Sequence, residues 1–486
     1  MKSLHDNRIR ALNARPLRRD GSFVLYWMTA SRRTRFNFGL QHAVDRAKEM
    51  ARPLVVLEAL RCDYRWACDR FHRFVLDGMA DNAERFRRAG VLYHPFVELE
   101  QGLGKGLLAQ LARHACLVVT DDFPAFMLPR MLEAGARQSA VRMEAVDSNG
   151  LLPMSTTDRV FPTAHAFRRF LQKELREDLA AFPRPDPLAR LRLPELKRLP
   201  APILKRWPAT SGLAESDALV GAMPIDHSVG VTQLKGGPSP ARAALRQFIQ
   251  RLDRYSEERN NLDVEITSGL SPYLHFGHLS SHEVCRSVLK HEDWTVDRLG
   301  TQTSGSREGW WGLSRPAEAF LDQLVTWREL GYNMCRGRED YDRYESLPEW
   351  AIKTLQEHVG DAREYVYTPE RFESATTHDE LWNAAQRQLR RDGKIHNYMR
   401  MLWGKKILHW SESPRDALDI MIELNNKYAL DGRDPNSYSG IFWVLGRYDR
   451  AWGPERPIFG KVRYMSSRNT RRKLKVAGYV ERYGTD

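Results

Sequence analysis

A regular alternation of apolar runs and amphipathic stretches between residues 23 and 148 most constrains the fold of this chain. Runs such as Phe23-Val24-Leu25-Tyr26-Trp27-Met28, rich in aromatic and β-branched residues, are typical of buried strands. Between the runs, apolar residues recur at helical spacing. The expected strands are residues 23–28, 54–57, 91–93, 117–120 and 141–146, and the clearest helices are residues 71–89 and 103–114. This order predicts a doubly wound, parallel-sheet α/β domain of Rossmann-like type.

The turn after the first expected strand argues against a dinucleotide-binding enzyme. Its residues are Thr29-Ala30-Ser31-Arg32-Arg33, without the G-x-G-x-x-G pattern. In dinucleotide enzymes that pattern lets the backbone approach a pyrophosphate. An enzyme of the usual Rossmann type is therefore disfavoured.

The second half of the chain has a different pattern. Pro-rich residues 183–240 predict an irregular connector, with a disordered tether as the alternative. After it, helical spacing predominates, most clearly in residues 243–255, 282–290, 317–334, 381–390 and 394–410. Residues 301–314, which contain Trp310 and Trp311, are expected to form an exposed insertion. We therefore predict an α/β domain at residues 1–182 with a basic arm at 1–20, a connector at 183–240 and an α-helical domain at 241–486.

The length and charge of the chain restrict its class. A chain of 486 residues is expected to form two domains, each with its own core. A net charge of +13 and an isoelectric point near 9.5 favour a polyanionic partner, and nucleic acid fits best. The alternative is a generally basic protein without such a partner.

The cysteines and the apolar runs indicate the cellular compartment. Five cysteines (Cys62, Cys68, Cys116, Cys285 and Cys335) are scattered without a C-x-x-C pair or a His at ligand spacing. A disulfide framework, an iron–sulfur cluster or another metal site is therefore not expected. Because no signal peptide and no membrane-spanning run is found, we expect a cytoplasmic protein, associated with the nucleoid if the source is bacterial.

A segment near the C-terminus combines charged, aromatic and turn-forming residues. It contains Leu430-Asp431-Gly432-Arg433-Asp434-Pro435-Asn436, then Gly440-Ile441-Phe442-Trp443, then Asp449-Arg450-Ala451-Trp452-Gly453. An ordinary core would contain aliphatic residues here, so we interpret the segment as the wall of a site. Together with Pro457-Ile458-Phe459-Gly460-Lys461-Val462-Arg463-Tyr464-Met465-Ser466, it resembles the end of the flavin domain of class II cyclobutane pyrimidine dimer (CPD) DNA photolyases, in the cryptochrome/photolyase family.

The resemblance implies a fold and an activity. It implies an antenna domain followed by a helical FAD-binding domain, and a deoxyribodipyrimidine photo-lyase that acts on UV-damaged DNA. In such enzymes, photoexcited reduced FAD gives an electron to a dimer that is flipped out of the duplex. It also implies an antenna chromophore, whose identity no residue pattern specifies. We expect a monomer without an obligate protein partner.

A small hydroxyl-rich loop is the candidate phosphate site for FAD. In this loop, residues 267–271, Pro272 follows where a helix would begin, so backbone N–H groups can converge on a pyrophosphate. A Ser/Thr-rich helix cap without a ligand explains the same residues. The resemblance implies that the FAD contacts are Tyr255, Thr267, Ser268, Gly269, Leu270 and Ser271, together with Arg328 on a later helix.

Three further residues are placed at the flavin ring. The resemblance puts Arg400 and Asp431 beside the isoalloxazine, and a buried charge needs such a partner. A plain interhelical salt bridge is the alternative. Asn425 matches the family position that faces flavin N5, where a neutral amide can donate or accept a hydrogen bond. Asn426 is adjacent, so a register error of one residue is open.

Tryptophans supply a candidate electron relay. Trp403 and Trp410 are seven residues apart and share one helix face. Aromatic residues at such spacing are more often core than relay. The resemblance nevertheless implies that Trp403 is the relay residue nearer the flavin and Trp382 the one farther out, with Trp410 on a side branch.

The lesion pocket is assigned in the same way. The resemblance implies that Trp327 and Trp443 flank the flipped dimer and that Met401 lies beneath it; two unrelated core tryptophans are the alternative. Arg450, Arg463 and the basic residues 468–475 are expected to contact phosphates, although the last run is also typical of a solvated tail.

One departure from the family pattern is expected to affect repair activity. Where class II photolyases carry Glu four residues before the pocket Trp, this chain carries Gln323. An amide donates a hydrogen bond but supplies no proton, so slower repair or a changed substrate preference is expected. Two other functions stay open: a cryptochrome-like blue-light photoreceptor without repair activity, and a basic DNA-binding protein without chemistry.

Overall fold

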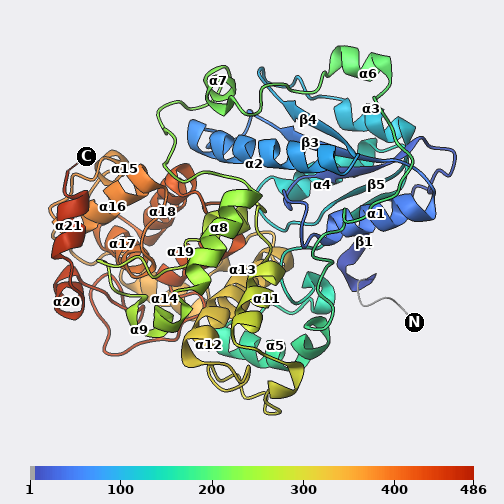
Figure 1. Cartoon of the computed structure of the whole chain (residues 1–486). Helices are drawn as coiled ribbons and strands as arrows, with labels where there is room; N and C mark the ends of the chain where they lie inside the picture. Colours follow the sequence, from blue (N-terminus) through green and yellow to red (C-terminus); the bar gives the residue numbers. More distant parts are fainter. Residues whose placement is uncertain (1–5, 486) are drawn as a thin grey trace. The chain divides into compact units, whose positions relative to one another are not determined.

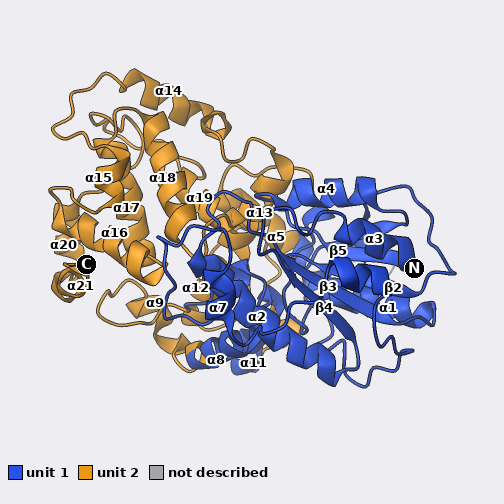
Figure 2. Cartoon of the chain, turned by 90° about the horizontal axis from the view of Figure 1, so that it is seen from above, with its two compact units in different colours: residues 1–157, 174–247, 269–293 blue, residues 158–173, 248–268, 294–486 orange. Residues whose placement is uncertain are grey.

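The computed structural model describes residues 6–485. Its internal contacts divide the chain into two units (Figure 2). Unit 1 contains the chain up to Thr157, Glu174–Gln247 and Gly269–Asp293, and unit 2 contains Asp158–Lys173, Phe248–Ser268 and the chain from Trp294. The units are therefore interleaved in sequence. The predicted boundaries at residues 182 and 240 do not coincide with them, because residues 158–173 group with the helical unit and residues 183–247 with the sheet.

Unit 1 is built on one six-stranded sheet with the order β1-β6-β5-β2-β3-β4 (Figure 1). Its strands are β1 Ile9–Ala11, β2 Phe23–Met28, β3 Leu54–Leu60, β4 Leu92–Val97, β5 Ala115–Asp121 and β6 Met143–Val146. Strands β2 to β6 pair in parallel, whereas β1 is antiparallel to β6. The predicted doubly wound α/β fold is confirmed. Strand β1 was not predicted from the sequence.

Both faces of the sheet are buried, as the continuous apolar runs require. Val24, Tyr26 and Val56 pack on one face against α1 (Phe38–Glu49) and Phe86 of α2 (Asp69–Arg88). The opposite face packs against α3 (Leu107–His114) and α4 (Leu128–Gln138). Alternate residues of each strand thus supply two separate apolar clusters.

The turn after β2 binds the carboxylate of Asp121, the last residue of β5. The backbone N–H groups of Thr29, Ala30 and Ser31 all donate to Asp121 Oδ2, at 2.8–2.9 Å. Tyr26 donates its hydroxyl to Asp121 Oδ1 at 2.7 Å, and burial raises the pKa of Tyr26 well above its ordinary value. The donors that a pyrophosphate would use in a dinucleotide enzyme are therefore taken within the protein, in agreement with the missing glycine pattern.

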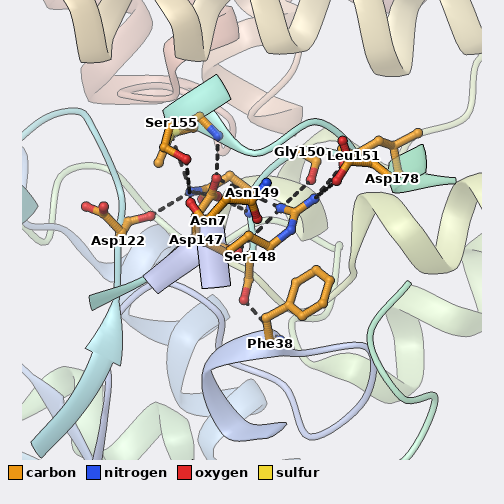
Figure 3. Close-up of polar contacts among 12 residues, drawn as sticks. Asn7, Phe38, Asp122, Asp147, Ser148, Asn149, Gly150, Leu151, Ser155 and Asp178 are labelled. Atoms are coloured by element: carbon orange, nitrogen blue, oxygen red, sulfur yellow. Dashed lines mark hydrogen bonds and ion pairs between the residues drawn. The ribbon is translucent and has the colours of Figure 1, made fainter. Parts of the chain in front are cut away.

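The N-terminal residues take part in the core. Arg8 is only 3 % exposed, and its guanidinium donates to the carbonyl oxygens of Gly150 (3.1 Å) and Leu151 (2.5 Å) (Figure 3). It also lies 3.9 Å from Asp147 and 4.0 Å from Asp178. The expected basic arm at 1–20 is thus wrong for Arg8, because two buried carboxylates need a cation; residues 1–5 lie outside the described residues.

The expected connector is more ordered than its composition suggested. It contains two short helices, α6 Ala201–Arg206 and α7 Ser216–Gly221. Ile203 and Trp207, which directly follows α6, belong to the apolar cluster of β2 and α3. Val220 belongs to another apolar cluster beside α2. The segment is irregular elsewhere, but it packs as part of unit 1.

The last segment of unit 1, Gly269–Asp293, packs against α2 and the loops beyond β2 and β6. It carries α10 (Ser271–His275) and α11 (Ser281–His291). His278 stacks on Phe74 with ring centroids 5.2 Å apart, and a Cβ on Gly78 would lie 2.3 Å from the His278 ring. Glycine at position 78 is therefore needed for this close contact.

Unit 2 is almost entirely helical, as predicted. Its helices include α9 Tyr255–Glu258, α12 Arg315–Leu321, a π-helical segment Asp322–Trp327, α13 Arg328–Gly337, α14 Glu349–Glu357, α15 Pro369–Glu373, α16 Glu380–Asp392, α17 Asn397–Trp410, α18 Pro414–Tyr428, α19 Pro435–Val444, α20 Ser467–Lys473 and α21 Ala477–Tyr483. Two further helices, α5 Ala164–Asp178 and α8 Pro238–Ile249, run from one unit into the other. Among residues 6–485, no helix has the length and apolar character needed to cross a bilayer.

The central helices of unit 2 approach one another closely. Helix α13 packs on α19, and α17 packs on α18 and α19. A Cβ on Gly331 would lie 2.6 Å from the Pro435 carbonyl oxygen, and a Cβ on Gly404 would lie 2.5 Å from Val444. Glycine at position 331 lets two backbones meet, and glycine at position 404 leaves room for the Val444 side chain. Both close contacts fix the helices that carry the candidate site.

The expected exposed insertion at 301–314 is only partly exposed. Trp310 and Trp311 are buried, at 6 % and 8 % exposure, because Trp311 packs against Trp294, which donates to its carbonyl oxygen at 2.7 Å. At the other end, Gly305 donates its N–H to Gln172 of α5 at 2.7 Å. The exposed part is limited to polar residues around 301–309.

Candidate functional site

Arg400 and Asp431 form the ion pair that the sequence suggested. Arg400 lies on α17, and its Nη2 donates to Asp431 Oδ1 at 3.0 Å and to Oδ2 at 3.3 Å. Asp431 lies between α18 and α19. The side chains are 21 % and 14 % exposed, so the pair is shielded from water but still accessible. A paired charge in such a position can bind a polar ring edge at little desolvation cost.

The two adjacent asparagines have different environments. Asn426 accepts from the Arg433 backbone N–H at 2.9 Å and donates to the Tyr438 hydroxyl at 3.1 Å, so its side chain holds the α18–α19 loop in place. Asn425, which is 2 % exposed, donates to Ser437 at 2.8 Å. Asn426 is committed to the loop through both side-chain atoms. Of the two residues, Asn425 is therefore the better candidate for a ligand contact.

Arg328 begins a buried polar chain between α13 and α19. It donates to the Tyr332 hydroxyl at 2.9 Å, and Tyr332 donates to Asp434 Oδ2 at 3.3 Å. Asp434 also caps α19 by accepting from the backbone N–H of Asn436 at 2.9 Å. Burial raises the pKa of Tyr332 well above its ordinary value, so Tyr332 remains a donor. This chain positions the start of α19 relative to α13.

Tyr255 is packed mainly into the core of unit 2. Its ring meets those of Phe248 and Phe320 edge to face, at 5.8 and 5.5 Å. The residue is 8 % exposed. This packing explains an aromatic residue here without a ligand, and the contact with FAD stays a prediction.

The candidate phosphate loop has a left-handed residue at its centre. Thr267 and Ser268 belong to unit 2, whereas Gly269, Leu270 and Ser271 belong to unit 1. Gly269 has φ +64°, with nothing within 4 Å of a Cβ built on it. The turn therefore requires glycine for its backbone conformation. Leu270 is buried, and Ser271 is exposed at the first position of α10.

The three predicted relay tryptophans lie close together, linked by one hydrogen bond and one ring contact. Trp403 and Trp382 are 2 % and 0 % exposed, and Trp382 donates its indole N–H to the Trp403 carbonyl oxygen at 3.0 Å. The ring of Trp410 lies 6.1 Å from that of Trp382. Trp382 is fully buried, so the electron relay from the surface, which stays a prediction, would have to pass through a neighbour such as Trp410.

Sequence reasoning missed the outer part of this path. The Trp410 ring lies 4.9 Å from His378 and 5.8 Å from Tyr367. Tyr365 stacks on His378 at 3.7 Å and is 36 % exposed. These residues belong to the loop before α15 and to the loop before α16, so no helical periodicity links them to the tryptophans.

Gln323 and Trp327 lie in the π-helical segment before α13. Both are partly exposed. The neighbouring Asp322 is held by Arg168 of α5, with Nε 2.7 Å from Oδ1 and both side chains 8 % exposed. Asp322 is therefore committed to a structural ion pair, which leaves Gln323 as the polar residue one turn before Trp327. A π-helical segment is frequently found at functional sites.

Two basic side chains lie close to the ring of Trp443 on α19. Lys405 Nζ lies 5.0 Å from its ring centroid, and the Arg463 guanidinium carbon lies 5.5 Å away. Arg463 also pairs with Asp449 at 3.0 Å, and its guanidinium lies 4.1 Å from the ring centroid of Trp452. This partly exposed aromatic wall with positive charge can contact flat bases and phosphates.

The other residues predicted to contact the lesion or its phosphates are exposed or partly exposed. Arg450 is exposed, with its guanidinium 4.6 Å from the ring centroid of Trp452. Met401 is partly exposed on α17, next to Arg400. In the basic run 468–475, helix α20 ends with Arg471, Arg472 and Lys473, all exposed.

Lys405 was not predicted from the sequence because a lysine within a helix is usually exposed. Here the residue is 0 % exposed and donates to the Val444 carbonyl oxygen at 2.6 Å. Burial lowers the pKa of Lys405 from 10.5 to about 7, Asp449 raises it and Arg463 lowers it further. No periodicity signal identifies such a residue, since α17 is buried on nearly every side.

The chain resembles known proteins along nearly its whole length. No family model matches it. It is 33 % identical over 481 residues to a deoxyribodipyrimidine photo-lyase of Methanothermobacter thermautotrophicus, covering 99 % of this chain and 98 % of the relative. It is 31 % identical to the photo-lyase of Arabidopsis thaliana, covering 98 % and 92 %, and 31 % identical to that of Potorous tridactylus, covering 94 % and 80 %.

A solved structure supports the fold. A bacterial class III photolyase from Agrobacterium tumefaciens superposes with a TM-score of 0.69 at 16 % identity, covering 95 % of this chain and 86 % of that one. At this identity the match describes the fold alone and does not test the predicted class II. The sequence relatives, which match both the sheet and the helical parts, decide the family. The chain belongs to the deoxyribodipyrimidine photo-lyase family.

Proposed function

We propose that the protein repairs cyclobutane pyrimidine dimers in DNA by light-driven electron transfer, as a class II photolyase with FAD as its cofactor. The observation that carries the proposal is the half-buried Arg400–Asp431 pair, together with buried Asn425 on α18, which packs on the helix of Arg400. A salt bridge alone does not explain why a neutral amide and a charged pair share this region. The full-length similarity to photo-lyases supports the same conclusion.

The donor set fits a flavin. The ring edge of an isoalloxazine carries carbonyl oxygens and ring nitrogens, which the Arg400 guanidinium and the Asn425 amide are able to contact. When bound, reduced FAD supplies the light-absorbing group and the electron that splits the cyclobutane ring. The part of the protein is to hold the ring, exclude water and keep Asp431 as counter-ion of Arg400. Tyr255, Thr267, Ser268, Gly269, Leu270, Ser271 and Arg328 complete the proposed FAD contacts.

The DNA side of the proposal rests on Trp443 and its cations. An extruded dimer needs aromatic walls, and its neighbouring phosphates need positive charge. We assign Trp327 and Trp443 as walls, Met401 as the contact beneath the dimer, and Arg450 and Arg463 as phosphate contacts. The net charge of +13 supports a DNA partner.

The aromatic path has a separate role in this proposal. Trp403, Trp382 and Trp410 carry electrons that reduce oxidised FAD before repair, and their burial protects the transfer from water. Unit 1 corresponds to the antenna domain, and an additional chromophore there is part of the proposal. We also propose that the protein acts as a monomer, without an obligate protein partner, in the cytoplasm or on the nucleoid.

Illumination of the reduced protein with dimer-containing DNA tests the function. Recovery of intact pyrimidines, measured against a dark control, is the expected result. Trp207→Phe serves as a control for replacing a buried tryptophan away from the proposed site, because Trp207 lies in the core of unit 1. It is expected to repair dimers as the wild type does. If flavin photoreduction occurs without any recovery, the cryptochrome-like function replaces the repair function; if the purified protein contains no flavin, both are refuted.

Gln323 offers a sharper test of class II repair. Gln323→Glu restores the residue type that the family carries at this position, and faster repair is expected because a carboxyl group is able to supply a proton. Gln323→Ala, which removes the hydrogen bond as well, is expected to be slower than the wild type. Equal rates for all three proteins would mean that position 323 does not contact the dimer.

A further inference from the structure

The connector of unit 1 carries a run of exposed basic side chains that the proposed repair site does not use. Residues 188–207 contain a single acidic residue, Glu195. They also contain six basic residues, all exposed, which we call the basic strip: Arg190, Arg192, Lys197, Arg198, Lys205 and Arg206. Six positive charges against one negative charge leave +5 within 20 residues, which creates a local positive field.

Leucine side chains anchor this strip to the fold. Leu191 and Leu193 pack on the apolar cluster that α1 covers, whereas Leu196 and Leu199 pack on the cluster of α3. The segment therefore passes from one face of the sheet to the other (Figure 1). Because its leucines are turned toward the core, the cations between them, such as Arg192, are turned toward the solvent.

The charges of the basic strip are not neutralised within the protein. Among residues 6–485, no salt bridge involves a cation of the strip. The guanidinium of Arg206 lies 4.6 Å from the ring centroid of Trp207, a contact that leaves its charge in place. By contrast, Arg87 and Arg88 on α2 both pair with Glu84. The strip therefore gives up no ionic partner when it approaches an anion.

The side chains of the strip favour a phosphate backbone over a base or a lipid. Trp207 is the only aromatic residue at 188–207, and it is 3 % exposed, so no ring is available for a base to stack on. The packed leucines leave little apolar surface for insertion into a bilayer. Cations without such neighbours fit the phosphates of a duplex, where the release of counterions drives binding.

The length of the strip also suits a duplex. Arg190 and Arg198 are eight residues apart, a distance that an extended chain spans with at most about 28 Å. One turn of B-DNA measures about 34 Å. The four cations from Arg190 to Arg198 are therefore able to reach phosphates within a single helical turn.

We propose that the basic strip is a second DNA-binding surface, which contacts the phosphates of duplex DNA regardless of sequence or damage. The strip lies in unit 1 and shares no residue with the proposed flavin and lesion contacts. The choice of DNA as the duplex rests on the proposed function, whereas the surface itself rests on its own unpaired charges. Contacts of this kind hold a protein on undamaged DNA and weaken as salt is added.

The salt dependence of binding to an undamaged DNA duplex tests the proposal. Fluorescence anisotropy of a labelled duplex, with the full-length protein kept in the dark, gives the affinity at each salt concentration. The strip variant carries four substitutions: Arg190→Gln, Arg192→Gln, Lys197→Gln and Arg198→Gln. Each phosphate contact contributes about 0.9 to the slope of log affinity against log salt. The slope is therefore expected to fall by about two to four, and the affinity at low salt by at least about tenfold.

A dispersed variant with the same loss of charge is the matched control. It carries Lys48→Gln, Lys105→Gln, Arg130→Gln and Lys235→Gln, at exposed positions scattered over unit 1. Its slope should differ from that of the wild type by less than about one. Thermal unfolding of both variants reports whether they are folded, and no loss of stability is expected because the replaced side chains are exposed.

Three outcomes would overturn the proposal. Equal changes of slope in the strip variant and the dispersed variant would mean that net charge alone matters. An unchanged DNA slope, together with loss of binding to phosphatidylglycerol vesicles, would assign the strip to a membrane surface. A slower repair by the strip variant at saturating damaged DNA would place the strip within the lesion site. Repair by the wild type is measured separately: its absence would refute the proposed function, while the slopes would still decide the role of the strip.

Discussion

Replacing buried Lys405 is predicted to stabilise the protein at low pH and to destabilise it at high pH. Its ammonium group lies within the helical unit, next to Trp443 and at the carbonyl end of α19, where it donates to Val444. A helix end with unpaired carbonyl groups favours such a donor. Burial nevertheless dominates, since the pKa of Lys405 falls from 10.5 to about 7. We consider the substitution Lys405→Met, which keeps the volume and removes the charge.

The magnitude follows from the pKa. At about 1.4 kcal/mol for each pH unit, the buried ammonium costs roughly 5 kcal/mol below pH 7. Because the folded-state pKa lies below the unfolded one, the unfolded chain binds more protons between about pH 7 and 10.5, and the free energy of unfolding rises with pH across that window. Methionine removes this cost but leaves the Val444 carbonyl without its donor, a loss of about 1–3 kcal/mol.

The variant should therefore be more stable than the wild type by about 2–4 kcal/mol at pH 6, and less stable by about 1–3 kcal/mol near pH 10.5. Urea unfolding followed by circular dichroism at pH 6, 8 and 10 measures the difference without screening charges. Lys353→Met, at an exposed position of α14, is the control and should show no comparable change with pH. A stability difference for Lys405→Met that is the same at pH 6 and pH 10 would refute the reasoning.

Three other substitutions test the proposed function. Trp403→Phe should slow photoreduction of oxidised flavin and leave repair by pre-reduced protein largely intact; unchanged photoreduction, with Trp207→Phe as reference, would remove Trp403 from the relay. Arg400→Ala should lower the flavin content of the purified protein, because Asp431 loses the cation that Arg400 supplies, and absorbance at the flavin band checks this. Arg450→Ala should weaken DNA binding uniformly and reduce the salt slope by about one; an unchanged slope would place Arg450 outside the phosphate contacts.

The sheet was predictable because its pattern is local. Strands buried on both faces give continuous apolar runs such as residues 23–28, and these runs matched the structure. Strand β1 was missed because Ile9–Ala11 is short and mostly exposed, and it is held by pairing with β6, far away in sequence. Arg8 was misread for the same reason: its carboxylate partners lie more than a hundred residues later.

The candidate site was predictable where short segments of the sequence carry its residues, such as Arg400 on α17 and Asp431 in the loop between α18 and α19. The Arg400–Asp431 pair, proposed from the sequence, is present in the structure. The outer aromatic path and buried Lys405 were not predictable, because they depend on how loops and helices pack rather than on spacing. The expected exposure of Trp310 was wrong, since Gly and Ser composition does not reveal the contact of its neighbour with Trp294.

The interleaving of the two units has a consequence for biosynthesis. A chain emerges from the ribosome from its N-terminus, and a contiguous domain can fold as soon as its own residues are available. Here the sheet unit still lacks Gly269–Asp293, including the His278 ring that packs at Gly78, after the first residues of the helical unit have been translated. The nascent sheet must therefore wait for Asp293. Cutting the gene at a single position yields no fragment that consists of one complete unit alone, because residues 1–293 also carry two segments of the helical unit.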